Sequence, residues 1–310
     1  MGFGSCVKLG LAILSVGLLS GIVPGPTFAA KEGNKQVICI DPGHQLRGNN
    51  QLEPVAPGSS TKKAKVSSGT RGVKTGKPEY MLTLEASLLL KEKLEAYGYT
   101  VVMTRDSHDV DVSNAERAQI GNEAQADLSV RIHADGASSP KVQGVSVLYP
   151  QWTEANHSIY EASKSAAQMI LEEVTDATGA VSRGIVPRSD LTGFNWSTVP
   201  SVLVEMGFMT NPAEDQKLSD PDYLNRLMEG MALGINKSLS VPADEPEMED
   251  SFSISLPDIT QLYEYTNGRL SRTRLALSSQ TVQVTATRGG WGKVETWVGE
   301  MWLHIGDMKR

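Results

Sequence analysis

The feature that most limits the fold is an alternation of strand-like and helix-like patterns between residues 36 and 240. Short apolar runs typical of buried strands lie at 36–40, 99–104, 127–132, 144–149 and 201–206. Patterns with helical spacing lie between and after them, at 80–98, 113–126, 153–178 and 223–239. Strands that alternate with helices need crossover connections. We therefore predict an α/β domain with a mostly parallel, twisted sheet flanked by helices on both faces.

One predicted helix carries a clear start signal. Ser113 precedes the pattern at 113–126, and Glu116 follows three residues later. A serine at the N-cap and a glutamate at the third helical position can satisfy each other's free backbone N–H groups, which is the capping box. The sequence therefore predicts that a helix begins at this serine.

The C-terminal part of the chain has a different pattern. Residues 252–310 contain short strand-like runs at 281–287 and 297–305, interrupted by Asn-Gly and Gly-Gly pairs, and tryptophan and tyrosine recur among them. This pattern favours a small all-β barrel. The stretch 242–250 holds five acidic residues, two prolines and no base, so we predict an acidic linker at 242–251.

The N-terminus resembles a secretory signal. Lys8 precedes an apolar run, and the small residues of Thr-Phe-Ala-Ala follow it. This order is typical of a cleaved signal peptide, which we place at 1–30 with cleavage after Ala29. The apolar run is short for a spanning helix, although an uncleaved anchor is the alternative. We expect a secreted, wall-located, monomeric protein with no stable membrane span after processing.

Cysteine content and charge exclude some classes of protein. Cleavage would leave Cys39 as the single cysteine, so no internal disulfide can form, and we predict that it is a small buried residue on a strand. The formal net charge is −7, whereas nucleic-acid binders normally present a basic face. We therefore expect no nucleic-acid partner.

Four side chains capable of metal or acid-base chemistry follow the predicted elements of the α/β domain. His44 follows the first strand, His133 follows the third, and Glu205 ends the last. Ligands gather at the carboxyl ends of strands in open α/β sheets. Glu79 begins the helix after Pro78, where an acid can also serve the helix dipole alone. A lone histidine at a strand end is more often structural, but the combination favours a zinc site with two histidines, one carboxylate and one free carboxylate as base.

The other three histidines, His108, His157 and His304, show no such setting, and we expect them at the surface.

At these residues the sequence resembles the zinc-dependent N-acetylmuramoyl-L-alanine amidases with the type 3 catalytic domain. The similar motifs occur in the family's order, and together they cover nearly all of 36–240: VICIDPGH, PEYMLTLEASLLLKEKLEAYGYTVVMTR, ERAQIGNEAQADLSVRIHAD and VPSVLVEMGFMTNPAED. The segment between the first two motifs resembles a subgroup with a long loop. The resemblance implies a catalytic domain at 31–241.

Carried over by position, the resemblance implies that zinc is held by His44, Glu79 and His133, with Glu205 as the catalytic acid/base. Glu85, on the same predicted helix, is the competing carboxylate ligand. The sequence departs from the family pattern at Arg131, where a small residue is usual, and this puts the local environment of the site in question.

The resemblance also leads to expectations for three further parts of the chain. Asp135 stands where asparagine is frequent. The segment RSDLTGFNW looks like a subgroup loop beside the catalytic strand, which suggests substrate contacts from Arg188, Asp190 and Asn195. Residues 252–310 resemble bacterial SH3-like wall-associated modules, although packed aromatics without glycan affinity would give the same pattern.

The resemblance implies hydrolysis of the amide bond between N-acetylmuramic acid and L-alanine in peptidoglycan, with Zn²⁺ as cofactor. Two alternatives share parts of the pattern. One is a zinc exopeptidase that acts on free peptides, and the other is a wall-binding protein without enzymatic activity.

Overall fold

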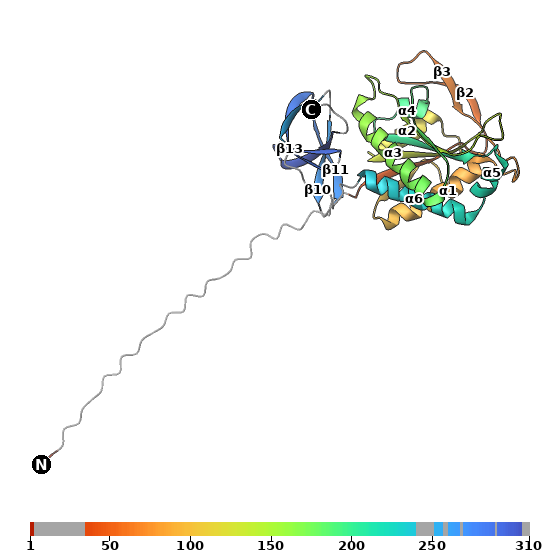
Figure 1. The fold of residues 1–310 in the computed structure, drawn as a ribbon. Helices are drawn as coiled ribbons and strands as arrows, with labels where there is room; N and C mark the ends of the chain where they lie inside the picture. The colour runs from red at the N-terminus through yellow and green to blue at the C-terminus, as the bar shows by residue number, and fades with distance from the viewer. Residues whose placement is uncertain (3–34, 240–250, 257–259, 267–268, 289, 306–310) are drawn as a thin grey trace. The chain divides into compact units, whose positions relative to one another are not determined.

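The computed structural model describes residues 1–2, 35–239, 251–256, 260–266, 269–288 and 290–305 of the 310-residue chain. The predicted signal peptide at 1–30 and almost all of the predicted linker at 242–251 lie outside these residues. The α/β part and the all-β part that follows it are described separately (Figure 1).

A six-stranded sheet forms the centre of the α/β part. Its strands follow the spatial order β4-β1-β5-β8-β6-β7. Their bounds are β1 Val37–Pro42, β4 Thr100–Met103, β5 Leu128–Asp135, β6 Val145–Pro150, β7 Ser182–Arg188 and β8 Ser201–Phe208. The first four strands of this order are parallel, whereas β6 runs antiparallel to β8 and parallel to β7. The prediction of a mainly parallel sheet is confirmed, with one antiparallel junction that was not predicted.

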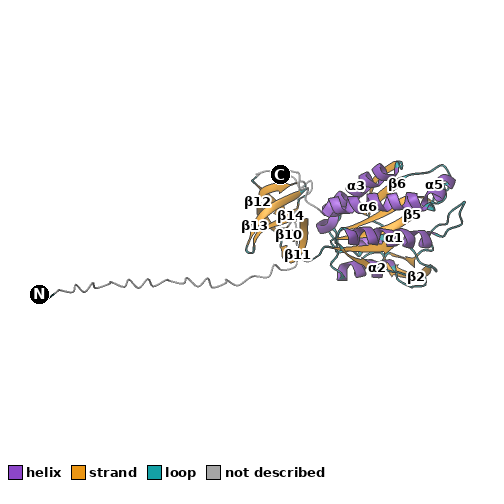
Figure 2. Cartoon of the chain, turned by 90° about the horizontal axis from the view of Figure 1, so that it is seen from below, coloured by secondary structure: helices purple, strands orange, loops and turns teal. Residues whose placement is uncertain are grey.

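Helices cover both faces of this sheet (Figures 1 and 2). The helices α1 Glu79–Ala96, α3 His157–Thr178 and α6 Pro221–Leu239 pack over one face. The helices α2 Asn114–Glu123 and α4 Thr192–Asn195 lie on the other, and α5 Pro212–Leu218 follows β8. The capping box of α2 is present with both of its hydrogen bonds, as the sequence predicts. None of the described helices is long and apolar enough to cross a bilayer.

The alternation of side chains along each strand divides the two faces chemically. Ile38 and Ile40 of β1 enter the main apolar core beneath α1, α3 and α6. Cys39 and Asp41 alternate with them and belong to the opposite face, since successive side chains of a strand point to opposite sides. Cys39 is buried, as predicted, and burial raises the pKa of its thiol to about 12.

The two strands that end at the predicted histidine and glutamate are longer than expected. β5 continues to Asp135 and β8 continues to Phe208. His133 therefore lies within β5 and not after its end, and Glu205 lies within β8 and not at its end. The two residues are register partners on adjacent strands. The pairing of β5 with β8 brings the two side chains to the same level of the sheet.

The long segment after His44 contains a hairpin that the sequence did not indicate. It consists of β2 Asn49–Pro54 and β3 Lys62–Val66, which pair with each other (Figure 1). The indole Nε1 of Trp196 donates to the carbonyl of Pro54 at 3.0 Å, and the amide of Asn195 donates to the carbonyl of Val55 at 3.2 Å. The hairpin is thereby attached to α4 and the residue after it.

The C-terminal part is all-β. Its strands are β9 Phe252–Leu256, β10 Thr260–Thr266, β11 Arg269–Leu277, β12 Gln280–Arg288, β13 Trp291–Thr296 and β14 Gly299–His304. Every described pair among them is antiparallel. Tyr263, Trp291 and Trp302 are buried together, whereas Trp297 is 69% exposed. The predicted all-β unit is confirmed, and its SH3-like character stays a prediction.

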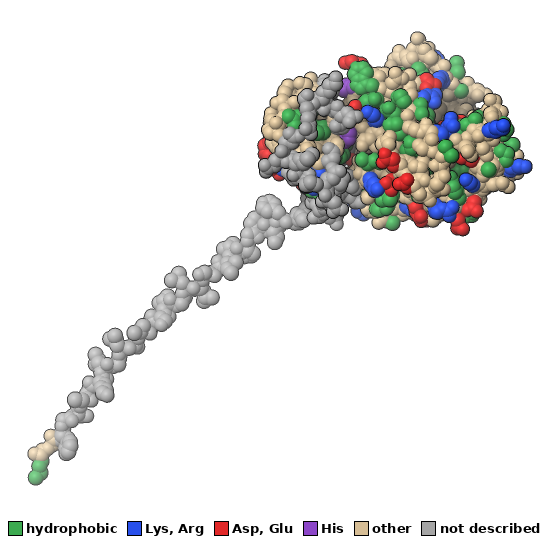
Figure 3. Space-filling view, viewed as in Figure 1, with side chains coloured by type: hydrophobic (Ala, Val, Ile, Leu, Met, Phe, Trp, Pro, Cys, Tyr) green, Lys and Arg blue, Asp and Glu red, His purple; other side chains and the backbone are tan. Residues whose placement is uncertain are grey.

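Charged side chains are mixed on the surface. Figure 3 shows Lys and Arg interspersed with Asp and Glu over the visible face of the α/β part. No single basic patch covers that face, as expected from the net charge of −7.

Candidate metal centre and its pocket

Three side chains from distant parts of the chain meet on the polar face of the sheet. The Nε2 atom of His44 lies 3.0 Å from Oε1 of Glu79, and Nδ1 of His133 lies 3.1 Å from the same oxygen. The two nitrogens are 3.2 Å apart. Atoms held by one zinc ion at about 2.0–2.2 Å in a tetrahedral arrangement lie a little over 3 Å from each other. The triangle therefore has the dimensions of a metal-ligand set.

The backbone at His44 is unusual. The proline and glycine before it end β1, but the residue with a left-handed conformation is His44 itself, with a φ of 62°. A non-glycine residue adopts this conformation at a cost, and such residues cluster at functional sites. The carbonyl of Ser67 accepts a hydrogen bond from Nδ1 of His44 at 2.9 Å. Because a carbonyl only accepts, Nδ1 donates a proton to it, and Nε2 faces Glu79.

Glu79 is held by backbone donors on both of its carboxylate oxygens. Thr70 donates its N–H to Oε2 at 2.8 Å, and Ala134 donates its N–H to Oε1 at 3.1 Å. Burial raises the pKa of this carboxyl, but the imidazoles of His133 and His44 outweigh that effect, and the net shift is downward. Glu79 is therefore an anion with one oxygen aimed at two nitrogens.

The Nε2 atom of His44 faces a carboxylate oxygen of Glu79 at 3.0 Å. Burial is the main cause that lowers the pKa of His133 to about 4, so its ring is neutral at pH 7. Two imidazoles and a carboxylate are a donor set that fits zinc.

Close backbone contacts leave little space around the ligands. A Cβ atom on Gly69, whose φ is 75°, would lie 2.7 Å from Oε2 of Glu79. A Cβ atom on Gly43 would lie 2.4 Å from Cε1 of His133. Glycine at both positions allows the backbone to pack against the ligand side chains.

Glu205 lies beside the triangle in the same pocket. Its Oε2 atom is buried and has no hydrogen-bond partner within the described part of the chain. Burial, followed by the negative charges of Glu79 and Asp135, raises its pKa well above the ordinary value of a glutamate. A buried carboxyl without a partner is costly, and it is common where a group must exchange a proton.

Glu85, the competing ligand, is placed elsewhere. Its carboxylate is half-exposed and pairs with Lys77 at 2.7 Å. It belongs to the same helix as Glu79 but six residues later, so it faces a different direction. The structure therefore brings Glu79, and not Glu85, to the two histidines. His108, His157 and His304 are half-buried, although we expected them at the surface, and they lie outside the three-residue group.

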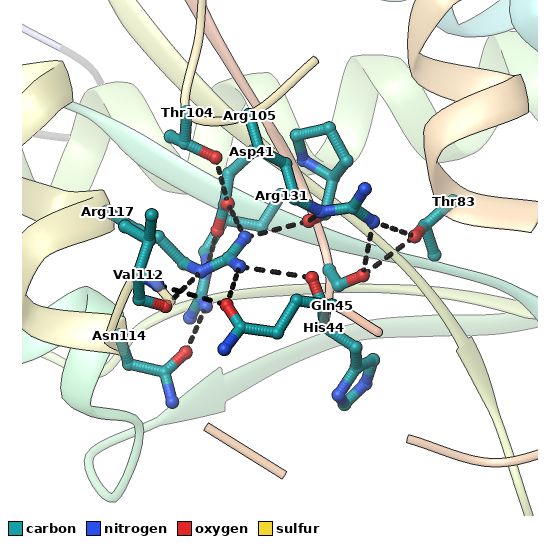
Figure 4. A network of polar contacts seen from close by, with 12 residues as sticks. Asp41, His44, Gln45, Thr83, Thr104, Arg105, Val112, Asn114, Arg117 and Arg131 are labelled. Atoms are coloured by element: carbon teal, nitrogen blue, oxygen red, sulfur yellow. Dashed lines mark hydrogen bonds and ion pairs between the residues drawn. The ribbon is translucent and has the colours of Figure 1, made fainter. Parts of the chain in front are cut away.

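A buried polar network supports the turn that carries His44 (Figure 4). Asp41 accepts from Arg117 at 2.7 Å and from Arg131 at 2.8 Å, and all three side chains are almost fully buried. Arg117 also donates to the carbonyls of Pro42 and His44 at 2.8 and 3.0 Å. The imidazole of His44 points away from this network in Figure 4, so the arginine holds its backbone and leaves its ring free.

A second buried arginine holds the same turn from the other side. Arg105 donates to the carbonyls of Pro42 and Gly43, both at 3.0 Å, and to the carbonyl of Tyr80 at 2.8 Å. It thereby joins the His44 turn to the first turn of α1, which carries Glu79. Arg105 and Arg117 could not be predicted as site residues, because nothing local in the sequence shows that they meet residues 42–44.

The triangle and Glu205 line a pocket of about 500 Å³. Lys63 of the hairpin and Asp190 line it as well, and their side chains are 3.1 Å apart. Arg188 makes two hydrogen bonds to the Asp190 carboxylate, at 2.7 and 3.0 Å.

Asn195 donates to the carbonyls of Val55 and Ser189. Of the three residues expected to contact substrate, Asp190 therefore lines the pocket, while Arg188 and Asn195 support its wall; their substrate contacts stay a prediction.

Comparison with known proteins identifies the family of the α/β part. The family description N-acetylmuramoyl-L-alanine amidase matches residues 38–237, which is most of the described α/β part. The chain belongs to this amidase family. It is an enzyme of the family by this match and by the relatives that share the domain.

The relatives agree over the same region. The chain is 30% identical over 206 residues to the N-acetylmuramoyl-L-alanine amidase Rv3717 of Mycobacterium tuberculosis, covering 63% of this chain and 85% of the relative. It is 25% identical over 247 residues to the amidase AmiC of Neisseria meningitidis, covering 68% of this chain and 54% of the relative. The chain thus spans about half of that second protein.

Solved structures show the same domain. The amidase Ami1 of Mycobacterium abscessus, in its apo form, has a TM-score of 0.60 at 28% identity, covering 66% of this chain and 99% of that one. The catalytic domain of CwlV from Bacillus (Paenibacillus) polymyxa var. colistinus has a TM-score of 0.54 at 26% identity, covering 66% and 98%. Both similarities correspond to the α/β part in extent.

Proposed function

We propose that this amidase cleaves the amide bond between N-acetylmuramic acid and L-alanine in peptidoglycan with a zinc ion held by His44, Glu79 and His133. The observation that carries the proposal is the triangle of ligand atoms at 3.0–3.2 Å beside the unpartnered carboxyl of Glu205. The bond itself is suggested by the names of the relatives in the same family.

The residues of the chain divide the work. A zinc ion at this site supplies Lewis acidity toward the scissile carbonyl and toward water. Glu205 takes a proton from the attacking water and returns it to the leaving nitrogen. Burial raises the pKa of this carboxyl well above its ordinary value, and a raised pKa suits a group that must both take up and release a proton. The Ser67 carbonyl and the Thr70 N–H keep His44 and Glu79 in their orientations.

We further propose an organisation for the whole chain. A signal peptide at 1–30 exports the catalytic domain at 31–241, and the linker at 242–251 joins it to an SH3-like wall-associated domain at 252–310. The protein would act as a secreted monomer in the cell wall. The all-β architecture of the C-terminal part and the wall amidases among the relatives support this organisation.

The replacement Glu205→Gln tests the function. We expect this variant to keep its zinc, because no ligand is changed, and to lose at least about 100-fold in rate, since general acid–base catalysis contributes about 10²–10⁴-fold. Mass analysis of digested sacculi should show stem peptides that begin with L-alanine, released from intact glycan by the wild type only.

Three results would contradict the proposal. Full activity of the Gln variant would exclude Glu205 as the acid/base. Loss of zinc in that variant would place Glu205 among the ligands. Cleavage of free peptides, with sacculi left untouched, would favour the exopeptidase alternative.

A further inference from the structure

Arg131 lines the pocket and has no part in the proposed chemistry. It precedes His133 by two residues on β5, so alternation places both side chains on the same face of the sheet. Its Nε donates to Asp41 at 2.8 Å, and its Nη2 donates to Asn114 at 2.7 Å. Both bonds fix the guanidinium at the floor of the pocket, which the residue lines.

The third nitrogen of this guanidinium is available. Nη1 of Arg131 has no hydrogen-bond partner within the described residues, yet it is not one of the fully enclosed unpaired atoms. Gly193 of α4 packs against it so closely that a Cβ atom there would lie 2.2 Å from Nη1. The arrangement leaves a fixed, charged donor at the edge of the pocket.

The carboxylate in contact with Arg131 is shared with a second arginine. Asp41 is the carboxylate that contacts it, and Asp41 is shared with Arg117. Lys63 lines the same pocket and pairs with Asp190. Lys63 donates to the carboxylate and to the carbonyl of Asp190. The carboxylate keeps its two bonds to Arg188 if Lys63 turns toward a ligand. Two cations are therefore available to an anionic group.

The carboxylates of Glu79, Glu205 and Asp135 also line the pocket, and the charge of Arg131 acts on Glu205. Two residues along a strand separate Arg131 from His133 by about 6.6 Å. An extended peptide covers about the same distance in two residues. A group bound at Arg131 would thus belong to the part of the substrate one or two residues from the scissile amide.

We propose that Arg131, assisted by Lys63, binds a carboxylate of the peptide stem close to the scissile bond, as a specificity-determining residue of the pocket. This inference rests on the proposed function, because the substrate is a muropeptide. Nη1 donates to the carboxylate, and the charge-assisted bond favours acidic stems over amidated ones.

Two synthetic muropeptides that differ only at the residue after L-alanine test the inference. One carries a free carboxylate at that residue, and the other carries a carboxamide. We expect the wild type to cleave the carboxylate form with a kcat/KM about tenfold or more above that of the carboxamide form, since a hydrogen bond between charged groups has that magnitude. In Arg131→Met the ratio should fall to about one, and Arg131→Lys should recover part of it. Lys63→Met should reduce the ratio by a smaller factor.

The ratio of two substrates does not depend on the fraction of folded enzyme, so loss of the Asp41 contact cannot imitate the effect. Zinc content of each variant is measured alongside. The matched controls Arg226→Met and Lys91→Met lie on α6 and α1, away from the pocket lining, and should keep the wild-type ratio.

The experiment distinguishes a failure of the Arg131 assignment from a failure of the proposed function. Cleavage of both substrates with an unchanged ratio in Arg131→Met, or with no preference in the wild type, would overturn the assignment of Arg131. Failure of the zinc-loaded wild type to cleave either muropeptide would overturn the proposed function, and the inference with it.

Discussion

Asp41 is a buried carboxylate that lies close to the site and is held by several donors. It is 1% exposed and accepts from two arginines and from Thr104. Burial raises its pKa, but Arg117 and Arg131 outweigh that effect and hold the pKa well below the ordinary value of an aspartate. The carboxylate therefore stabilises the folded state only while it is ionised.

Replacing Asp41 with Asn should destabilise the protein by about 3–5 kcal/mol at pH 7, because it leaves buried guanidinium groups unpaired. Urea denaturation measures the loss. Asp109→Asn is the control, since Asp109 is 76% exposed and pairs with Arg47 at the surface, and it should change stability by about 0.5 kcal/mol or less.

The pH dependence of this difference has a defined sign. The folded pKa of Asp41 is depressed, so its stabilising effect is present above the unfolded pKa of about 3.9 and is lost as the pH falls below it. The difference in free energy of unfolding between the wild type and Asp41→Asn should therefore shrink as the pH falls below about 4. An advantage that stays constant across this range would show that the carboxylate charge is not the cause.

Sequence patterns identify individual residues well where the reason is local. The buried state of Cys39 and the capping box of Ser113 and Glu116 were predicted from strand position and spacing, and the structure confirms both. The left-handed conformation of His44 and its support by Arg105 and Arg117 were not predicted, because they depend on contacts between residues more than sixty positions apart.

At the scale of elements, the strands of the α/β part that were missed are those without a clear apolar pattern. β2 and β3 are mostly polar, and each is held by pairing with the other. β7 contains a glycine and a proline, which lower any expectation of a strand. The length of one connection indicates the antiparallel direction of β6. Residues 136–144, which join β5 to β6, are too few for a helical crossover, and a short connection reverses the direction of the chain.

The attachment of the β2–β3 hairpin gives a prediction at this scale. Asn195→Ala removes the bond to the carbonyl of Val55, so amides of residues 50–66 should exchange with deuterium faster, while those of β5 should not change. Asn225→Ala, which removes an exposed side-chain bond on α6, is the control. Unchanged exchange in the hairpin would mean that Asn195 does not hold it.

At the scale of the whole molecule, the α/β part belongs to an amidase family, and the proposed chemistry depends on three chain segments that meet at one point. The family was predicted from four motifs in order, and the match over 38–237 confirms it. The zinc dependence, the wall-associated role of the C-terminal part and the export of the protein are proposals whose tests differ, so each can fail without the others.

Zinc content per chain is the most direct test of the central claim, that His44, Glu79 and His133 together bind one ion. We expect one zinc per chain in the wild type and in Glu85→Gln, and none in His44→Ala, Glu79→Gln or His133→Ala, with all five proteins folded by circular dichroism. Retention of zinc in Glu79→Gln, or its loss in Glu85→Gln, would contradict the account.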